Sequence, residues 1–153
     1  MQLANNEELD TFLKIHPSIK MMEVLMIDMN GIIRCKRIPR SEFTELFTEG
    51  LKSPASTVLL NVKGEFCDEL DKADLDGDPD RLIRPIKNTL SIIPWLESET
   101  AQVLSTFTEL DGEPNLFDSR NVLINSLKPL YALGLKLVVA TELEFYLIKK
   151  GDS

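Results

Sequence analysis

The sequence has little positive charge and no long apolar run. Seventeen Lys and Arg stand against 25 Asp and Glu, for a formal net charge of −8, which argues against a nucleic-acid-binding module because a phosphate backbone must be neutralised by a basic surface. The longest apolar stretches, such as residues 135–140, fall far short of the roughly 20 residues of a membrane helix. The first ten residues lack the basic and apolar parts of a secretory signal. We therefore expect a cytoplasmic protein with no membrane segment.

Cysteine and histidine are too sparse to build the common sites. Cys35 and Cys67 are too few and too far apart for a disulfide framework or a zinc site, so we expect two reduced thiols. The single histidine, His16, stands beside a proline without a nearby nucleophile, which excludes hydrolytic Ser-His-Asp or Cys-His chemistry. The seven glycines form neither a phosphate loop nor a dinucleotide fingerprint, so no motif here predicts nucleotide binding.

The pattern of apolar and turn residues predicts an α+β domain. Apolar runs bounded by turn signals predict about five strands, over residues 23–28, 32–38, 57–62, 90–95 and 101–107. The Asn30-Gly31 turn joins the first two as a hairpin, and the last two form a second hairpin. Helices are expected over residues 6–16 and from Ser41 onward. A small mixed sheet packed against a crossing helix is the architecture that follows.

The pattern changes after the turn-rich residues 111–115. Asp118 or Ser119 is expected to cap a helix that ends at Gly134, and strands are expected over residues 135–140 and 142–148. A helix and two strands need a partner surface for their apolar faces. They either pack on the first domain or open a second domain that has been cut off.

Two glutamates in the last expected strand are candidate metal ligands. In an extended strand Glu142 and Glu144 share one face, roughly 7 Å apart, while Leu143, Phe145 and Leu147 bury the other. Two carboxylates at that spacing suit divalent cations such as Mg²⁺ or Mn²⁺. Periodicity alone favours a solvated strand face over a metal site.

Acidic and basic side chains gather in two further places. Residues 65–80 hold eight acids and one Lys, with no EF-hand spacing, so they are a solvated surface or lend Asp78 and Asp80 to a cation site. The basic residues are Arg34, Lys36, Arg37 and Arg40. We expect them to pair with acidic groups between subunits or within the chain rather than to bind a ligand.

Taken in order, these pieces resemble the glutamine synthetase family, including its γ-glutamylpolyamine synthetase members. The matching segments are residues 27–39, 77–81, 88–90, 94–95, 111–114, 117–123, 134–135 and 142–147. The resemblance covers about residues 20–150. It implies three regions: a helical lead-in over 1–19, a β-grasp domain over 20–107 and the truncated start of a catalytic domain over 108–153.

The resemblance also implies an activity. Family members are ATP- and Mg²⁺- or Mn²⁺-dependent ligases that phosphorylate the γ-carboxylate of glutamate and let ammonia or an amine displace the phosphate. By this resemblance Glu142 and Glu144 match two metal-binding glutamates, and Asp80 lies where an acid approaches the ammonium or amine. The family builds its active site between subunits of a ring, so a homo-oligomer, a dodecamer of two hexameric rings, is implied for the full-length parent.

The sequence departs from the family pattern in two respects. Residues 61–65 stand where ammonia-using members carry an Asp-Gly-Ser-Ser loop, which favours an amine or polyamine as the nitrogen donor, or an uncharacterised variant, over ammonia. Family members are much longer, and their ATP contacts lie beyond the equivalent of Ser153, so we expect the 153-residue chain alone to be inactive. The alternative is a non-catalytic β-grasp interaction module that docks on a full-length relative.

Overall fold

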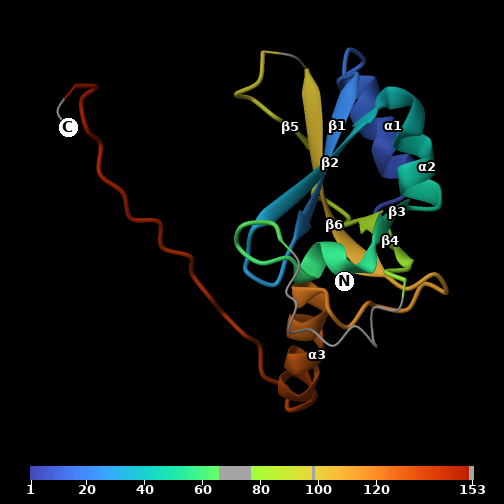
Figure 1. Cartoon of the computed structure of the whole chain (residues 1–153), viewed down its shortest axis with the longest axis vertical. Helices are drawn as coiled ribbons and strands as arrows, with labels where there is room; N and C mark the ends of the chain where they lie inside the picture. The colour runs from blue at the N-terminus through green and yellow to red at the C-terminus, as the bar shows by residue number, and fades with distance from the viewer. Residues whose placement is uncertain (66–76, 98, 152–153) are drawn as a thin grey trace.

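The computed structural model describes residues 1–65, 77–97 and 99–151. Its helices are α1 (Asn6–Ile15), α2 (Phe43–Thr48) and α3 (Ser119–Ala132), with short 3₁₀ helices η1 (Arg40–Glu42) and η2 (Ala55–Leu59). Its strands are β1 (Met21–Ile27), β2 (Ile33–Pro39), β3 (Leu51–Pro54), β4 (Asp80–Pro85), β5 (Ser91–Ile92) and β6 (Thr100–Thr108). The predicted α+β class is confirmed (Figure 1).

One curled sheet organises the domain. Its strand order is β2-β1-β6-β4-β3, and β5 pairs with β6 outside this path. The central pair β1–β6 is parallel, and the other pairs are antiparallel. Both predicted hairpins, β1–β2 and β5–β6, are confirmed. Parallel neighbours need a long crossover, and here the chain between β1 and β6 supplies α2 and the strands of the other half of the sheet.

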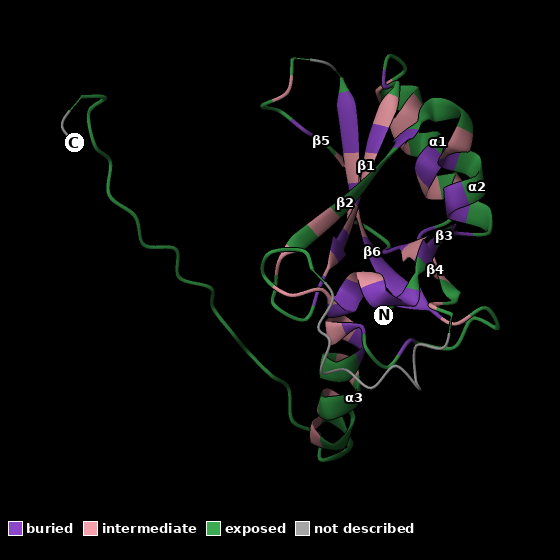
Figure 2. Ribbon diagram, in the orientation of Figure 1, coloured by how far each residue is buried: buried purple, intermediate pink, exposed green. Residues whose placement is uncertain are grey.

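The core lies between the sheet and the two helices α1 and α2. Along β1 the buried side chains alternate, with Met22, Val24 and Met26 at most 4% exposed. Figure 2 shows buried residues along β1, β6 and α2. Phe43 of α2 and Leu9 of α1 enter this core. The sheet and the two helices each bury one apolar face against the other layer, and this burial holds the two layers together.

Two predicted strands are wrong in extent or kind. Residues 57–62 were expected to be a strand, but η2 occupies Ala55–Leu59 because Pro54 precedes it and the Asp78 carboxylate accepts hydrogen bonds from the Ser56 amide and hydroxyl, at 2.9 and 2.7 Å. The strand expected over 90–95 shortens to β5. Tertiary contacts override the β-branched composition in the first case.

The helix α3 is confirmed, but the strands expected after it are absent. Asp118 caps α3, accepting from the Arg120 amide at 2.8 Å, and Gly134 follows it with φ +73°. Residues 135–149 have no regular structure and are exposed, and Figure 1 shows them leading away from the sheet. A strand needs a hydrogen-bonded neighbour, and no described residue supplies one. Among the described helices, none is long and apolar enough to cross a membrane.

Candidate functional site

The tip of the β1–β2 hairpin is built around a buried carboxylate. Asp28 is 1% exposed, and its Oδ1 accepts hydrogen bonds from the amides of Asn30 and Ile32, both at 2.9 Å. Its Oδ2 pairs with Arg34, at 2.9 Å to Nε and 2.7 Å to Nη2. A turn residue whose side chain bonds the backbone two residues on is an Asx turn. Asp28 therefore fixes the turn and orients Arg34.

The charge of Asp28 is stabilised although it is buried. Burial raises the pKa of this carboxyl, but the hydrogen bonds from Ile32, Arg34 and Asn30 and the positive charge of Arg34 together outweigh it. The pKa therefore lies below its usual range, and the group is ionised at neutral pH.

Arg34 and Asn30 connect the hairpin tip to the loop over residues 58–65. Arg34 Nη2 donates to the Asn61 carbonyl at 3.0 Å, and Asn30 Nδ2 donates to the Leu60 carbonyl at 2.7 Å. Within the loop, Asn61 Oδ1 accepts from the amides of Lys63 and Glu65, at 2.8 and 3.0 Å. Figure 1 shows this loop beside the hairpin tip. The loop over residues 58–65 is thus internally hydrogen-bonded and anchored to β2.

The four basic residues between Arg34 and Arg40 have partners within the chain. Intrachain pairing was one of the two alternatives expected for them, the other being pairing between subunits. Besides Arg34, Arg37 pairs with Glu23 at 3.2 Å, and Lys36 donates to a backbone carbonyl of β3 at 3.2 Å. Arg40 Nη1 donates to two carbonyls before β1, at 2.8 and 2.7 Å. These interactions hold strands and turns together.

Asp78 and Asp80 have different environments. Asp78 has φ +44°, and its carboxylate accepts hydrogen bonds from the amide and hydroxyl of Ser56. Its role is therefore to hold the chain before β4 against η2. Asp80 begins β4, opposite Pro54, and is exposed. Its carboxylate has no hydrogen bond or ion pair with any residue that the structure describes. The rest of the acidic segment, residues 66–76 with Cys67, lies outside the described residues.

Cys35, the other cysteine, is a free thiol on the edge strand β2. Its partial desolvation and then the negative charge of Glu23 raise the pKa of the thiol, against a smaller lowering by Arg37. The neutral thiol that results is a weak nucleophile.

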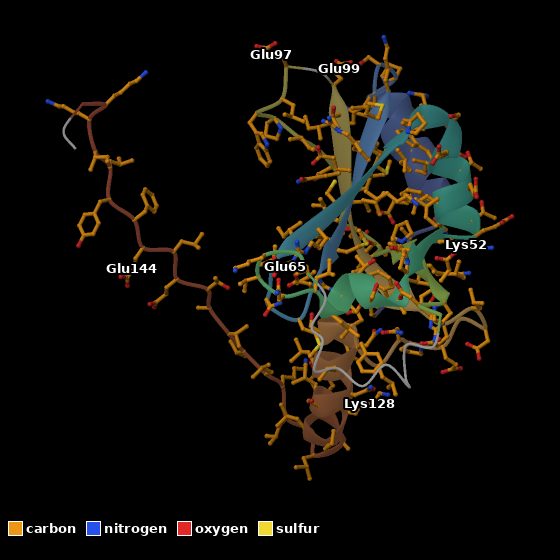
Figure 3. All side chains as sticks on the ribbon, viewed as in Figure 1. Lys52, Glu65, Glu97, Glu99, Lys128 and Glu144 are labelled. Atoms are coloured by element: carbon orange, nitrogen blue, oxygen red, sulfur yellow. The ribbon has the colours of Figure 1, made fainter. Side chains whose placement is uncertain are left out.

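The two glutamates predicted as metal ligands lie in the exposed tail. Glu142 and Glu144 belong to no strand, and both are exposed. Figure 3 shows Glu144 on the extended segment, well away from the sheet. Within the described ranges no three acidic, histidine or cysteine side chains are grouped to hold a metal ion. The structure therefore does not bring Glu142 and Glu144 together with Asp80.

Sequence reasoning missed a buried polar joint between β6 and α3. The Asp118 carboxylate accepts from the Thr106 hydroxyl at 2.8 Å and the Phe107 amide at 2.7 Å. Asn121 Nδ2 donates to the carbonyls of Phe107 and Asn115, at 3.1 and 3.0 Å. Asp118 and Asn121 are 5% and 3% exposed. The cap signal of Asp118 was visible in the sequence, but its second role on β6 was not.

Comparison with known proteins finds relatives that are named as synthetases or ligases. The γ-glutamylputrescine synthetase PuuA of Escherichia coli strain K12 is 34% identical over 96% of this chain and 31% of its own length. A glutamate–isopropylamine ligase from a Pseudomonas species is 32% identical over 80% of the chain and 27% of its own length.

A glutamine synthetase from Pyrococcus horikoshii is 30% identical over 88% of the chain and 27% of its own length. The chain therefore spans less than a third of the length of these relatives. No protein-family model matches it.

Proposed function

As its sequence predicted, this chain belongs to the glutamine synthetase family, and we propose that it is part of a cytoplasmic ATP-dependent ligase that joins glutamate to an amine. The observation that carries the proposal is the 30–34% identity to three ligases over 80–96% of the chain. Two of these relatives are named for an amine, putrescine or isopropylamine. An amine is therefore the proposed nitrogen donor, with ammonia as the alternative.

In the proposed reaction the γ-carboxylate of glutamate attacks the γ-phosphorus of ATP, which releases ADP and leaves γ-glutamyl phosphate. The amine nitrogen then attacks the γ-carbonyl carbon, the bond to the phosphate oxygen breaks, and the nitrogen loses a proton as the amide forms. The protein's part in such a transfer is to position the reactants and to balance their charges.

Glu142 and Glu144 are the proposed ligands of divalent ions. Carboxylate oxygens are the donors that Mg²⁺ and Mn²⁺ prefer, and neither side chain is engaged by a described residue. When bound, such an ion neutralises the phosphoryl oxygens. Extended backbone at these positions directs both carboxylates to one side, while Leu143 and Phe145, 84% and 76% exposed, are left for an apolar surface.

Asp80 is the proposed contact for the cationic amine. Its carboxylate is exposed and unpaired within the described part of the chain, and the hydrogen bonds of Asp78 to Ser56 hold the backbone just before it. An anionic group on a fixed backbone attracts an ammonium and sets its approach. The backbone of the loop over residues 58–65 is also held in place, by the hydrogen bond from Arg34 to the Asn61 carbonyl.

The proposed site is completed by protein beyond the sheet domain. The β4 end that carries Asp80 and the tail that carries Glu144 lie apart, and two carboxylates are fewer than the six ligands of an octahedral ion. We propose that the sheet is a β-grasp domain that closes on the catalytic domain of a neighbouring subunit in a ring. The 153-residue chain by itself is then inactive.

The test is an assay of the polypeptide in which this segment occurs, purified from its source cell. We expect phosphate release that requires ATP, glutamate and an amine, with putrescine, isopropylamine and ammonia compared. Glu144→Ala is expected to lower kcat by about a hundredfold or more, because loss of even an outer partner of a metal ligand costs 10–100-fold. The control Glu97→Ala, an exposed acid near β6 (Figure 3), is expected to leave kcat unchanged.

The outcomes separate the proposals. Wild-type turnover by Glu144→Ala refutes the metal assignment but leaves the ligase intact. No phosphate release with any of the three nitrogen donors refutes the ligase and favours the non-catalytic interaction module.

A further inference from the structure

The hairpin tip contains Asn30-Gly31, the one Asn-Gly pair in the sequence. The backbone nitrogen after an asparagine is a nucleophile toward the side-chain carbonyl carbon, and a following glycine hinders its approach least because it has no Cβ. Asn30 is exposed to water. Gly31 has φ +78°, and no atom lies within 4 Å of the position a Cβ would occupy. Composition and access both favour intramolecular attack at this position.

We propose that Asn30 is a deamidation site and that the folded hairpin tip and the loop over residues 58–65 hold it in the amide form. This inference is independent of the ligase function. It concerns a covalent modification of the chain and the contact that the modification breaks.

The step balances without a co-reactant other than water. The Gly31 nitrogen loses its proton and bonds to Asn30 Cγ, the Cγ–Nδ2 bond breaks, and ammonia leaves. The resulting succinimide ring is opened by water. Opening at the Cγ–N bond gives aspartate with the original backbone, and opening at the main-chain carbonyl gives isoaspartate, through which the chain continues by way of Cγ. No group is oxidised or reduced.

Three hydrogen bonds oppose this attack in the folded chain. The Gly31 amide donates to the Asp28 carbonyl at 3.0 Å, so the proton that must leave is engaged. The Asn30 side-chain amide donates to the Leu60 carbonyl at 2.7 Å, and the Asn30 backbone amide donates to Asp28 Oδ1 at 2.9 Å. The negative charge of Asp28 also disfavours a second negative charge on the Gly31 nitrogen. The turn must open before the ring can close.

The product changes the contact with the loop. Aspartate or isoaspartate at position 30 has no N–H to donate to the Leu60 carbonyl, and at neutral pH its carboxylate lies against that carbonyl oxygen and near the buried Asp28. Removing a donor and adding a like charge both weaken the interaction. Deamidation therefore loosens the loop over residues 58–65 from the hairpin tip.

The rate is measured by tryptic mass spectrometry of the full chain. Trypsin cuts after Lys20 and Arg34 and releases a peptide whose one amide side chain is Asn30. The folded chain and the chain in guanidinium chloride are incubated side by side at pH 8.5. We expect deamidation to be about tenfold slower in the folded chain, or slower still, because releasing one hydrogen bond costs about a factor of ten. Equal rates refute the protection, and an unmodified peptide from the denatured chain refutes the site.

A variant that removes the hydrogen bonds of Arg34, which anchor the hairpin tip to the loop, gives a second test of the deamidation rate. Arg34→Met removes the bonds to Asp28 and to the Asn61 carbonyl, and we expect faster deamidation of Asn30 under folding conditions. Arg37→Met is the matched control, because it removes a cation from the same strand without touching the turn. Circular dichroism verifies that both variants are folded. A rate for Arg34→Met equal to that of Arg37→Met refutes the role of the anchor.

The effect on the loop is read from limited proteolysis after Lys63, which is exposed within it. Asn30→Asp is expected to raise the initial cleavage rate at Lys63 severalfold over wild type. Asn125→Asp adds the same charge on the exposed surface of α3 and is expected to leave that rate unchanged. Equal cleavage of Asn30→Asp and wild type refutes the loosening of the loop.

Discussion

Replacing Asp28 by asparagine tests whether the buried carboxylate holds the hairpin tip. The new side chain keeps one oxygen for the amides of Asn30 and Ile32, but its NH₂ group faces the Nε and Nη2 donors of Arg34, which now lie 2.9 and 2.7 Å from the carboxylate oxygen. The Arg34 side chain is 23% exposed and that of Asp28 is fully buried. The substitution therefore leaves a largely buried guanidinium facing another donor.

The expected cost is about 2–4 kcal/mol of unfolding free energy. Breaking a buried ion pair by removing one partner costs about 3–5 kcal/mol, and Arg34 recovers part of this through water and the Asn61 carbonyl. The matched control is Glu23→Gln on β1, whose ion pair with Arg37 is more accessible to water, at 25% and 52% side-chain exposure, and is worth less than about 1 kcal/mol. Urea unfolding followed by circular dichroism measures both, at an expected m-value of about 2 kcal/mol per M.

The difference depends on pH with a definite sign. Because the pKa of Asp28 is lowered in the folded chain, its ionised form stabilises the fold at pH values above the unfolded pKa of about 4. This contribution disappears as the pH falls through the lowered pKa. The gap between wild type and Asp28→Asn is therefore full at pH 7 and narrows below pH about 4. A loss below 1 kcal/mol at pH 7, or a gap that widens on acidification, contradicts the assignment.

Three further outcomes are expected. Gly50→Ala is expected to lower the free energy of unfolding by about 2 kcal/mol or more, because φ is +86° and the added Cβ would lie 2.9 Å from a backbone oxygen of β4. The control Gly112→Ala, with φ +90° and no atom near the added Cβ, is expected to lower it by only about 1 kcal/mol in the same urea titration. Asp118→Ala loses about 2–4 kcal/mol because three hydrogen bonds go, against less than about 0.5 for the exposed Ser126→Ala. A chain ending at residue 134 binds less apolar dye at an unchanged melting temperature, because the exposed apolar side chains of the tail are removed.

Local signals explain which parts of the fold were predictable. The β1–β2 hairpin follows from Asn30-Gly31, whose turn chemistry acts within four residues. The ends of α3 follow equally from a capping Asp118 and a terminal Gly134. Each of these residues acts on backbone groups within a few positions of it, so its effect can be predicted without knowing the rest of the fold.

The errors arose where distant residues decide. Residues 57–62 have strand-like composition, but Asp78, twenty-two residues after Ser56, holds the chain in a 3₁₀ turn there. The strand β4 was hidden by the acidic run before it, and its pairing with β3 and β6 is long-range. The roles of Asp28 and Arg34 likewise depend on a loop some thirty residues away. Pairing partners of this kind leave no periodic trace in a single sequence.

The candidate site was predicted as residues and not as geometry. Spacing and charge first indicated Glu142, Glu144 and Asp80, and the resemblance then gave them roles; the structure places Asp80 at the start of a strand and the glutamates on an exposed tail. A segment with alternating carboxylates and apolar side chains forms a strand only where another strand pairs with it. Among the described residues no strand pairs with this segment, so nothing local fixes its conformation.

The joint at the base of α3 determines how such a partner surface is oriented. Hydrogen bonds are directional. Asp118 accepts three, two from β6 and one from the Arg120 amide, and Asn121 donates two, to the carbonyls of Phe107 and Asn115. The helix therefore leaves the sheet at a set angle and extends for roughly 21 Å, at 1.5 Å per residue, although most of its surface beyond Asn121 is exposed. A surface packed on α3 is therefore held at a fixed orientation to β6. Since β4 pairs with β6, the same joint sets the position of that surface relative to Asp80.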